Sequence, residues 1–340
     1  ILALNNPVMM LVVYGCITAL SWFGARFIVG GSLTTGELTS MFSYVMSILM
    51  SLMMLSMMFV MLVLTRASAA RIVEVLSEKN AITDDDADAS LSVPDGSIEF
   101  RDVCFSYSND PSNLTLSHIN LKIKRGETIG IIGGTGSAKS SLVQLIPRLY
   151  DVLSGSVLVG GHDVREYKIK TLRDSVSMVL QKNVLFSGTI RDNLRWGDEN
   201  ATDAEIEAAC RAAAAHDFIT AFPAGYETDL GQGGVNVSGG QKQRLCIARA
   251  LLKRPKIIIL DDSTSAVDTA TDAAIRKALR EELASTTTII IAQRITSVMD
   301  ADRIIVMHDG QIEDVGTHAE LVERNEIYRE VYESQQKGVA

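Results

Sequence analysis

The sequence predicts a transmembrane helical hairpin followed by a soluble α/β domain. Three observations lead to this fold class. The 340-residue chain opens with two long apolar stretches that carry little charge. After them, apolar strand-like segments alternate with helix-like ones, which is the pattern of a parallel sheet covered on both faces. A glycine-rich loop joins one of these strands to a helix. A chain of this length also exceeds one ordinary compact core, so at least two domains are expected.

The apolar part, residues 1–75, contains two predicted membrane helices at about 8–29 and 41–64. Each is long enough to cross roughly 30 Å of hydrocarbon. The stretch "GGSLTTGEL" between them, residues 30–38, is typical of a short loop in water. Arg66 and Arg71 follow the second helix, which predicts that this end and all that follows lie in the cytoplasm. The chain begins with Ile1, not Met, so we expect a fragment of a multi-pass cell-membrane protein that lacks upstream spans.

The composition argues against several other classes of protein. A net charge of −9 is unsuited to nucleic-acid binding, which needs a basic surface, so no nucleic-acid partner is expected. The four cysteines and five histidines are scattered without the spacing of a disulfide framework or a zinc site. The acidic run "DDDAD" lies in residues 76–96, which we interpret as a solvated linker between the membrane part and the soluble part.

The soluble part, residues 97–338, begins with strands and continues with strands that alternate with helices. The segments "SIEFRDVCF" and "LTLSHINLKI" alternate apolar and polar residues, which predicts half-buried antiparallel strands. Later apolar runs predict a parallel sheet. Between them, "DAEIEAACRAAAAHDFITAF", residues 203–222, is predicted to be helical.

The glycine-rich loop predicts a phosphate site. In "GETIGIIGGTGSAKSSLVQLI" a strand leads through the loop into a helix, so backbone N–H groups can point at phosphate oxygens beside the helix start. Lys139 can neutralise the terminal phosphates of ATP, and Ser140 can ligate Mg²⁺. Ala138 stands where the pattern GxxxxGK[ST] has its second glycine, and its methyl group is expected to weaken nucleotide binding. The candidate ATP-binding residues of the loop are Gly133, Gly134, Thr135, Gly136, Ser137, Ala138, Lys139, Ser140 and Ser141.

Two adjacent acids end the buried strand "IIIL" and predict a second part of the same site. Asp261 is placed to hold Mg²⁺ through water, and Asp262 to orient the water that attacks the γ-phosphate. Gln181 ends another predicted strand and can reach Mg²⁺ or water with its amide. On their own, two carboxylates could be a solvated turn, but here they follow a phosphate loop and a buried strand.

A second anion site is predicted in "VNVSGGQKQRLCIARALL". Ser238 can cap a helix, and Gly239 and Gly240 allow another molecule to approach its N-terminus. One ATP has one triphosphate, yet the chain carries two such helix starts. This suggests a dimer in which each nucleotide is enclosed by the loop of one chain and the "SGGQ" of the other, Ser238 to Gln241.

Taken together, these motifs resemble the C-terminal part of an ABC transporter of the exporter type. "GGTGSAKSS" resembles Walker A, "VSGGQ" the signature, "IIILD" Walker B, "SAVD" the D-loop and Gln181 the Q-loop. The resemblance covers essentially the whole chain. It implies an α/β P-loop NTPase domain with an antiparallel β subdomain and a helical subdomain. It also implies that Tyr107 stacks on adenine and that Asp268 reports across the dimer interface.

Two departures from the family pattern concern catalysis. The family usually has Glu where this chain has Asp262, and a switch His where this chain has Gln293. Asp is shorter than Glu by about 1.5 Å, and Gln cannot change its protonation at neutral pH. With Ala138, these residues predict a site that binds ATP and hydrolyses it slowly. The catalytic candidates are thus Asp262, Gln293 and Gln181, the Mg²⁺ candidates are Ser140, Gln181 and Asp261, and the expected partner is a second ABC half-transporter in a heterodimer.

Two alternatives share the same motifs. One is an ATP-gated regulatory or channel-like membrane protein, and the other is a homodimeric exporter with unusual residues. The transported substrate is expected to be a small molecule, lipid or peptide, with an apolar or amphipathic one favoured. Methionines on one face of the second membrane helix can line a pocket for such molecules or pack against lipid or other helices: Met46, Met50, Met53, Met57 and Met61.

Overall fold

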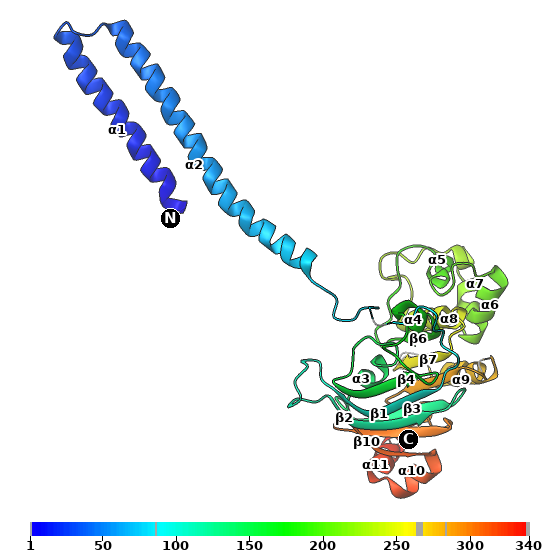
Figure 1. The fold of residues 1–340 in the computed structure, drawn as a ribbon. Coiled ribbons are helices and arrows are strands. Elements are labelled where there is room, and N and C mark those ends of the chain that lie inside the picture. The colour runs from blue at the N-terminus through cyan, green and yellow to red at the C-terminus, as the bar shows by residue number, and fades with distance from the viewer. Residues whose placement is uncertain (1, 86, 263–267, 283, 338–340) are drawn as a thin grey trace. The chain divides into compact units, whose positions relative to one another are not determined.

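The computed structural model describes residues 2–85, 87–262, 268–282 and 284–337 (Figure 1). The chain divides into two compact units, Ile1–Ala81 and Ile82–Ala340. The first is a pair of helices, and the second holds the sheets and the remaining helices. Each unit is described separately.

The first unit is a helical hairpin made of α1 (Leu2–Val29) and α2 (Thr35–Ser77). The turn between the helices is shorter than the predicted loop at 30–38, because Thr34 and Glu37 form a capping box that starts α2 at Thr35. The two helices approach closely near Gly24, where a Cβ atom would lie 2.3 Å from Leu38 Cδ1.

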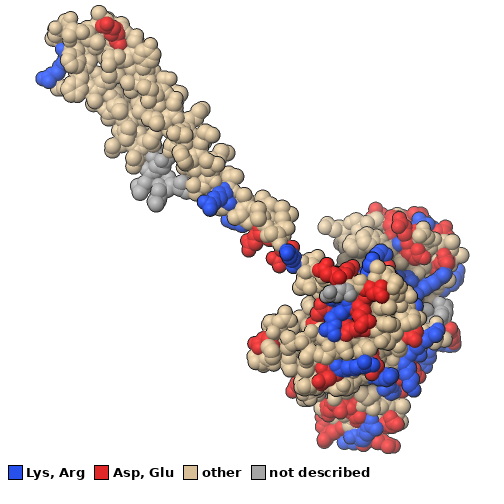
Figure 2. Space-filling model, in the orientation of Figure 1, with Lys and Arg blue, Asp and Glu red and all other residues tan. Residues whose placement is uncertain are grey.

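Both helices of the hairpin are long and apolar enough to cross a membrane, with candidate spans Pro7–Val29 and Thr35–Ser77. Figure 2 shows an almost uncharged surface over most of the hairpin, with charged residues gathered towards its ends. The second unit instead carries acidic and basic residues side by side over the face in view. An apolar, nearly uncharged surface suits contact with lipid, and a surface rich in charged side chains suits contact with water.

The second unit contains a four-stranded sheet with the strand order β2-β1-β4-β5. β1 pairs antiparallel with both β2 and β4, and β4 pairs antiparallel with β5. The two antiparallel strands expected from the alternating segments are β1 and β2, so that prediction is confirmed. The strands are β1 (Ile98–Phe105), β2 (Leu116–Ile123), β4 (Ser154–Val159) and β5 (His162–Asp163).

The second sheet has six strands in the order β10-β9-β3-β8-β7-β6. All neighbouring pairs are parallel except β9 and β10, which are antiparallel. Parallel strands end at the same edge of a sheet, so the segments that follow β3, β6, β7 and β8 are brought together there. The strands are β3 (Thr128–Gly133), β6 (Val176–Val179), β7 (Ile257–Asp261), β8 (Thr287–Ile291), β9 (Arg303–His308) and β10 (Gln311–Gly316).

The six-stranded sheet is buried on both faces. In β7, Ile257 and Ile259 join one core cluster, while Ile258 and Leu260 join the other. Successive side chains of a strand point to opposite faces, which explains why this strand is a continuous apolar run and does not alternate. The cluster around Ile257 extends to the four-stranded sheet, and the other extends to the helices α6 (Asp203–Ala212) and α8 (Gly239–Leu252).

The helices of the second unit cover this core (Figure 1). The helix predicted at 203–222 is in fact two helices, α6 and α7, because Ala214 between them adopts a left-handed conformation with φ of 51°. The helices are α3 (Lys139–Gln144), α4 (Ile169–Ser175), α5 (Ile190–Arg195), α6 (Asp203–Ala212), α7 (His216–Thr220), α8 (Gly239–Leu252), α9 (Thr269–Glu282), α10 (His318–Arg324) and α11 (Glu326–Lys337), with 3-10 turns η1 (Gly225–Glu227) and η2 (Ile295–Ser297).

Candidate nucleotide site

The glycine-rich loop joins the end of β3 to the start of α3. Lys139 Nζ donates hydrogen bonds to the carbonyl oxygens of Gly133, at 2.9 Å, and Gly134, at 2.8 Å. Its ammonium group therefore lies across the loop. The first backbone amides of a helix have no acceptor within the helix, so those that open α3 are available to an anion.

The loop leaves room for a ligand. A Cβ atom at Gly134 or Gly136 would meet no atom within 4 Å, and Gly136 has φ of +86°, which favours glycine. Gly133 is different, because a Cβ there would lie 2.3 Å from the Met307 carbonyl oxygen of β9. Exposed Thr135 and buried Ser137 complete the loop, and Ser137 Oγ donates to the Gly134 carbonyl oxygen at 2.9 Å.

Ala138 adopts a left-handed backbone conformation, with φ of 67° and ψ of 23°. This conformation costs an ordinary L-residue roughly 1–2 kcal/mol, and glycine adopts it freely. Alanine in place of glycine at position 138 therefore costs backbone conformational energy, in addition to the steric crowding expected from its methyl group.

Asp261 and Ser140 lie together beside the loop. Asp261 is 7% exposed, and its carboxylate interacts with the Ser140 hydroxyl. Burial raises the pKa of Asp261, while the Ser140 hydrogen bond and the Lys139 charge oppose the rise. Burial likewise lowers the pKa of Lys139, and the charges of Asp261 and Asp262 act against it. Adjacent hydroxyl and carboxylate oxygens are the donors that Mg²⁺ prefers, so these residues fit the ion.

Asp262 accepts hydrogen bonds from two glutamines. Gln181 Nε2 lies 3.1 Å and Gln293 Nε2 lies 2.7 Å from the same oxygen, Oδ2. The backbone N–H of Asp262 donates to the Ile291 carbonyl oxygen at 2.9 Å, and its φ is 46°. Burial and the neighbouring Asp261 charge raise the pKa of Asp262, and both glutamine hydrogen bonds oppose this. Residues far apart in the sequence thus meet at the end of β7.

The sequence reading missed Gln243, which also contacts this acid. Its side chain is 1% exposed, and its Nε2 lies 3.5 Å from the Asp262 carbonyl oxygen. Gln243 is on α8, the helix that begins at the signature residues. A direct contact therefore connects that helix to the residue at the end of β7.

Tyr107 lies beside the start of α3. Its hydroxyl is 2.9 Å from Ser141 Oγ and donates to Gln144 Oε1 at 3.3 Å. The ring of Tyr150 packs edge-on against that of Tyr107, with centroids 5.0 Å apart. Tyr107 remains 53% exposed, so its ring is open to a stacking partner. Tyr150 was also missed, because a lone aromatic in a loop carries no sequence signal.

The signature residues form the start of α8. Ser238 Oγ accepts from the Gln241 backbone N–H at 3.3 Å, and Gln241 Oε1 accepts from the Ser238 N–H at 2.9 Å, which completes a capping box. Gly239 and Gly240 are its first helical residues. The helix-cap prediction for Ser238 is therefore confirmed. Among the residues that the structure describes, no hydrogen bond joins these four to the phosphate loop.

Asp268 lies just before α9. Its carboxylate accepts from the Thr271 backbone N–H at 2.9 Å and from Thr271 Oγ1 at 2.7 Å. These hydrogen bonds lower the pKa of Asp268. The other residues of the predicted "SAVD" segment, 265–267, lie outside the described residues.

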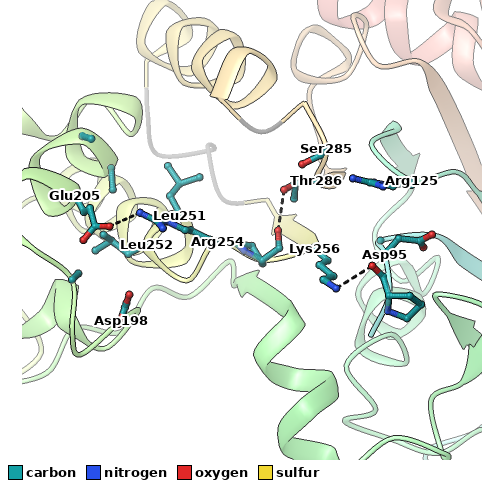
Figure 3. Close-up of a pocket in the computed structure, with 16 residues that line it drawn as sticks. Asp95, Arg125, Asp198, Glu205, Leu251, Leu252, Arg254, Lys256, Ser285 and Thr286 are labelled. Carbon is teal, nitrogen blue, oxygen red and sulfur yellow. Dashed lines mark hydrogen bonds and ion pairs between the residues drawn. The ribbon is translucent and has the colours of Figure 1, made fainter. Parts of the chain in front are cut away.

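A pocket of about 470 Å³ lies elsewhere, at the amino ends of β7 and β8 (Figure 3). Two of its basic side chains contact neighbouring protein atoms: Arg254 pairs with Glu205, and Lys256 Nζ donates to the Pro94 carbonyl oxygen at 3.0 Å. It is therefore separate from the nucleotide candidates, which follow the carboxyl ends of the strands. Across the described ranges, no cluster of three or more His, Cys, Asp or Glu side chains forms a metal site.

Comparisons with known proteins agree with this geometry. Residues 116–265 match the family model described as ABC transporter. The chain is 41% identical over 332 residues to the ABC transporter ATP-binding protein YfiB of Bacillus subtilis, a match that covers 97% of this chain and 56% of YfiB. It is 37% identical over 331 residues to the ATP-dependent lipid A-core flippase of Desulfotalea psychrophila, covering 97% of this chain and 57% of the flippase.

A solved structure, described as a bacterial Atm1-family ABC exporter with ATP bound, superposes with a TM-score of 0.83 at 32% identity, covering 98% of this chain and 59% of that one. The chain thus spans a little over half the length of these relatives. Over the part that it covers, the chain has the fold of that exporter structure: two apolar helices precede a domain whose residues 116–265 match the ABC transporter family model.

Proposed function

We propose that this chain is the ATP-binding and permease part of an ABC exporter subunit, and that its own ATP site hydrolyses slowly. The observation that carries the second point is the arrangement at Asp262, whose Oδ2 accepts hydrogen bonds from both Gln181 and Gln293. ATP binding and hydrolysis would be coupled to export of a substrate from the cytoplasmic side of the cell membrane.

Nucleotide binding is assigned to groups that the fold brings together. Lys139 and the open amides of the loop would bind the phosphates, and the exposed ring of Tyr107 would stack on adenine. Ser140 and Asp261, with Gln181, would hold Mg²⁺. When bound, the ion neutralises charge on the phosphate oxygens.

Slow hydrolysis follows from how Asp262 is held. An attacking water must compete with two amide donors for Oδ2, and an Asp carboxylate reaches about 1.5 Å less far than Glu would. Positioning errors of this size are costly for a group that must orient a nucleophile. Gln293 supplies a hydrogen bond but cannot carry a proton at neutral pH.

The intact signature supports a role in a second ATP site. We infer that Ser238 to Gln241 close on ATP held by a partner subunit, and that Asp268 lies at the interface between the two subunits. A partner with a working acid would make the complex a heterodimer. The flippase relative acts, by its name, on a lipid, which supports an amphipathic substrate for this chain.

The test is steady-state ATP turnover of the complete complex in lipid. Asp262→Asn is compared with the equivalent change at the partner's Walker B acid. We expect near-normal turnover for Asp262→Asn and its loss for the partner variant. A loss of roughly 10²- to 10⁴-fold from Asp262→Asn, the range expected for removing a positioned base, would show that Asp262 is a working catalytic group and refute the asymmetric site.

A further inference from the structure

Helix α11 contacts the backbone of the segment that carries Gln293. Gln335 Nε2 donates to the Gln293 carbonyl oxygen at 2.8 Å, and Gln335 Oε1 accepts from the Ile295 backbone N–H at 2.9 Å. One side-chain amide therefore pairs with the backbone on both sides of Arg294. This two-point contact fixes the direction of the peptide chain as well as its position.

The packing of α11 explains why Gln335 reaches this segment. Tyr328 is fully buried in the core, and its hydroxyl lies 2.9 Å from His318 Nδ1. Val331 and Tyr332 are partly buried and pack against the same core. Gln335 follows Tyr328 by seven residues, nearly two helical turns, and so lies on the same face of α11. The face of α11 that packs on the core therefore ends at Gln335, whose side-chain amide contacts the Gln293 segment.

The other end of the segment is also fixed. In the turn after Gln293, Val298 packs so closely on β3 that a Cβ atom at Gly130 would lie 2.6 Å from Val298 Cβ. With the turn held on β3 and the backbone held by Gln335, the Gln293 side chain reaches Asp262 Oδ2 at 2.7 Å. The contacts run without a break from α11 to Asp262.

We propose that Gln335 is a positioning residue that holds Gln293 against Asp262, so that retention of ATP in this site depends on α11. The inference rests on the proposed function, since it assigns Gln293 to an ATP site. A purely structural role predicts something different. If Gln335 only secured the end of α11, its loss would leave Gln293 and bound ATP unaffected.

The variants are chosen to remove hydrogen bonds while keeping side-chain size. Gln335→Met removes both bonds to the segment. Gln335→Glu keeps the acceptor for the Ile295 N–H and loses the donor to Gln293. Gln336→Met is the matched control, because Gln336 is the next residue of α11 and donates to the Tyr332 hydroxyl at 2.8 Å instead.

Two readouts on the complete complex test the inference. Hydrogen exchange reports on amides 292–297, and photolabelling with radioactive 8-azido-ATP, chased with unlabelled ATP, reports how long this subunit retains nucleotide. Gln335→Met is expected to raise the exchange and to speed ATP release about five- to tenfold, which corresponds to the loss of one net hydrogen bond, the one from Gln293 to Asp262. Gln335→Glu should also raise both, because a carboxylate oxygen would then face the Gln293 carbonyl oxygen, and Gln336→Met should change neither.

A double variant separates positioning from general loosening. In a Gln293→Ala background, Gln335→Met should no longer change ATP release, because the side chain it positions is gone. Unchanged exchange in Gln335→Met, unchanged release, or full additivity in the double variant would each overturn the inference. If the wild-type subunit takes up no photolabel, the proposed function fails and the role in ATP retention fails with it. The exchange data would still show whether Gln335 holds the segment.

Discussion

At the residue scale, the candidate site residues include two carboxylates, Asp262 and Asp268, whose surroundings shift their pKa values in opposite directions. Asp262 is buried beside Asp261, so its folded-state pKa is raised, while Asp268 is exposed and accepts two hydrogen bonds from Thr271, so its pKa is lowered. A raised pKa means that the folded state favours the protonated acid. Its contribution to stability is present below the ordinary value of 3.8 and is lost as pH rises through the folded-state pKa.

This difference predicts opposite effects of two matched substitutions without nucleotide. Asp262→Asn should raise the thermal midpoint at pH 7, and the gain should shrink as pH falls through the raised pKa towards 3.8. Asp268→Asn should lower the midpoint at pH 7, and this loss should shrink as pH falls below 3.8 and disappear as it falls through the lowered pKa. Thermal melts across the pH range check both. A lower midpoint for Asp262→Asn at pH 7 would contradict the assigned cause.

Individual site residues can be predicted from the sequence where a motif fixes their spacing. The sequence predicts Lys139, Ser140 and Asp261 as site residues, because a phosphate loop and a strand-ending acid impose their order on the chain. Gln335 could not be identified, because its partner Gln293 lies 42 residues away and only the packing of α11 brings them together. The left-handed backbone of Ala138 was also beyond reach, because the residue type favours a right-handed conformation.

At the element scale, α8 begins with a cap whose two roles can be separated. Ser238→Ala should lower stability by about 1 kcal/mol, within the usual 0.5–2 for a lost cap, and should also lower ATP turnover of the complex if Ser238 serves the partner's ATP. Thr202→Ala is the matched control. Its capping box with Glu205 has nearly the same distances, 3.4 and 2.8 Å, and starts α6, outside the candidate site.

Chemical denaturation and steady-state turnover together check this prediction. Both variants should lose similar stability, and only Ser238→Ala should lose turnover. An equal fall in turnover in both would mean that the loss comes from weakened folding and not from the signature.

Elements were predictable where local chemistry decides their ends. The cap at Ser238 follows from four adjacent residues, and the strands of the sheet follow from apolar runs. The break between α6 and α7 was missed because the run "AAAA" has high helix propensity throughout, and the tertiary fold imposes a left-handed turn at Ala214. The early start of α2 has a local signal in the capping pair Thr34 and Glu37, but the glycines of the same segment favour a loop.

At the scale of the whole molecule, the proposal requires both ends of the hairpin to lie on defined sides of the membrane. Ser32 lies in the turn between α1 and α2, and Ser77 ends α2 after Arg66 and Arg71. Positive charge favours the cytoplasmic side, so Ser77 should be inside and Ser32 outside. Both side chains are exposed, so cysteines at these positions would be accessible from water.

The orientation is tested with a membrane-impermeant thiol reagent on intact cells that express the complete protein. The native cysteines, which in this chain are the free Cys16, Cys104, Cys210 and Cys246, are first replaced by alanine or serine. Ser32→Cys should be labelled in intact cells, whereas Ser77→Cys should be labelled only after permeabilisation. Labelling of Ser77→Cys in intact cells would place the ATP-binding domain outside the cytoplasm, away from its ATP supply, and would rule out the proposed transport function.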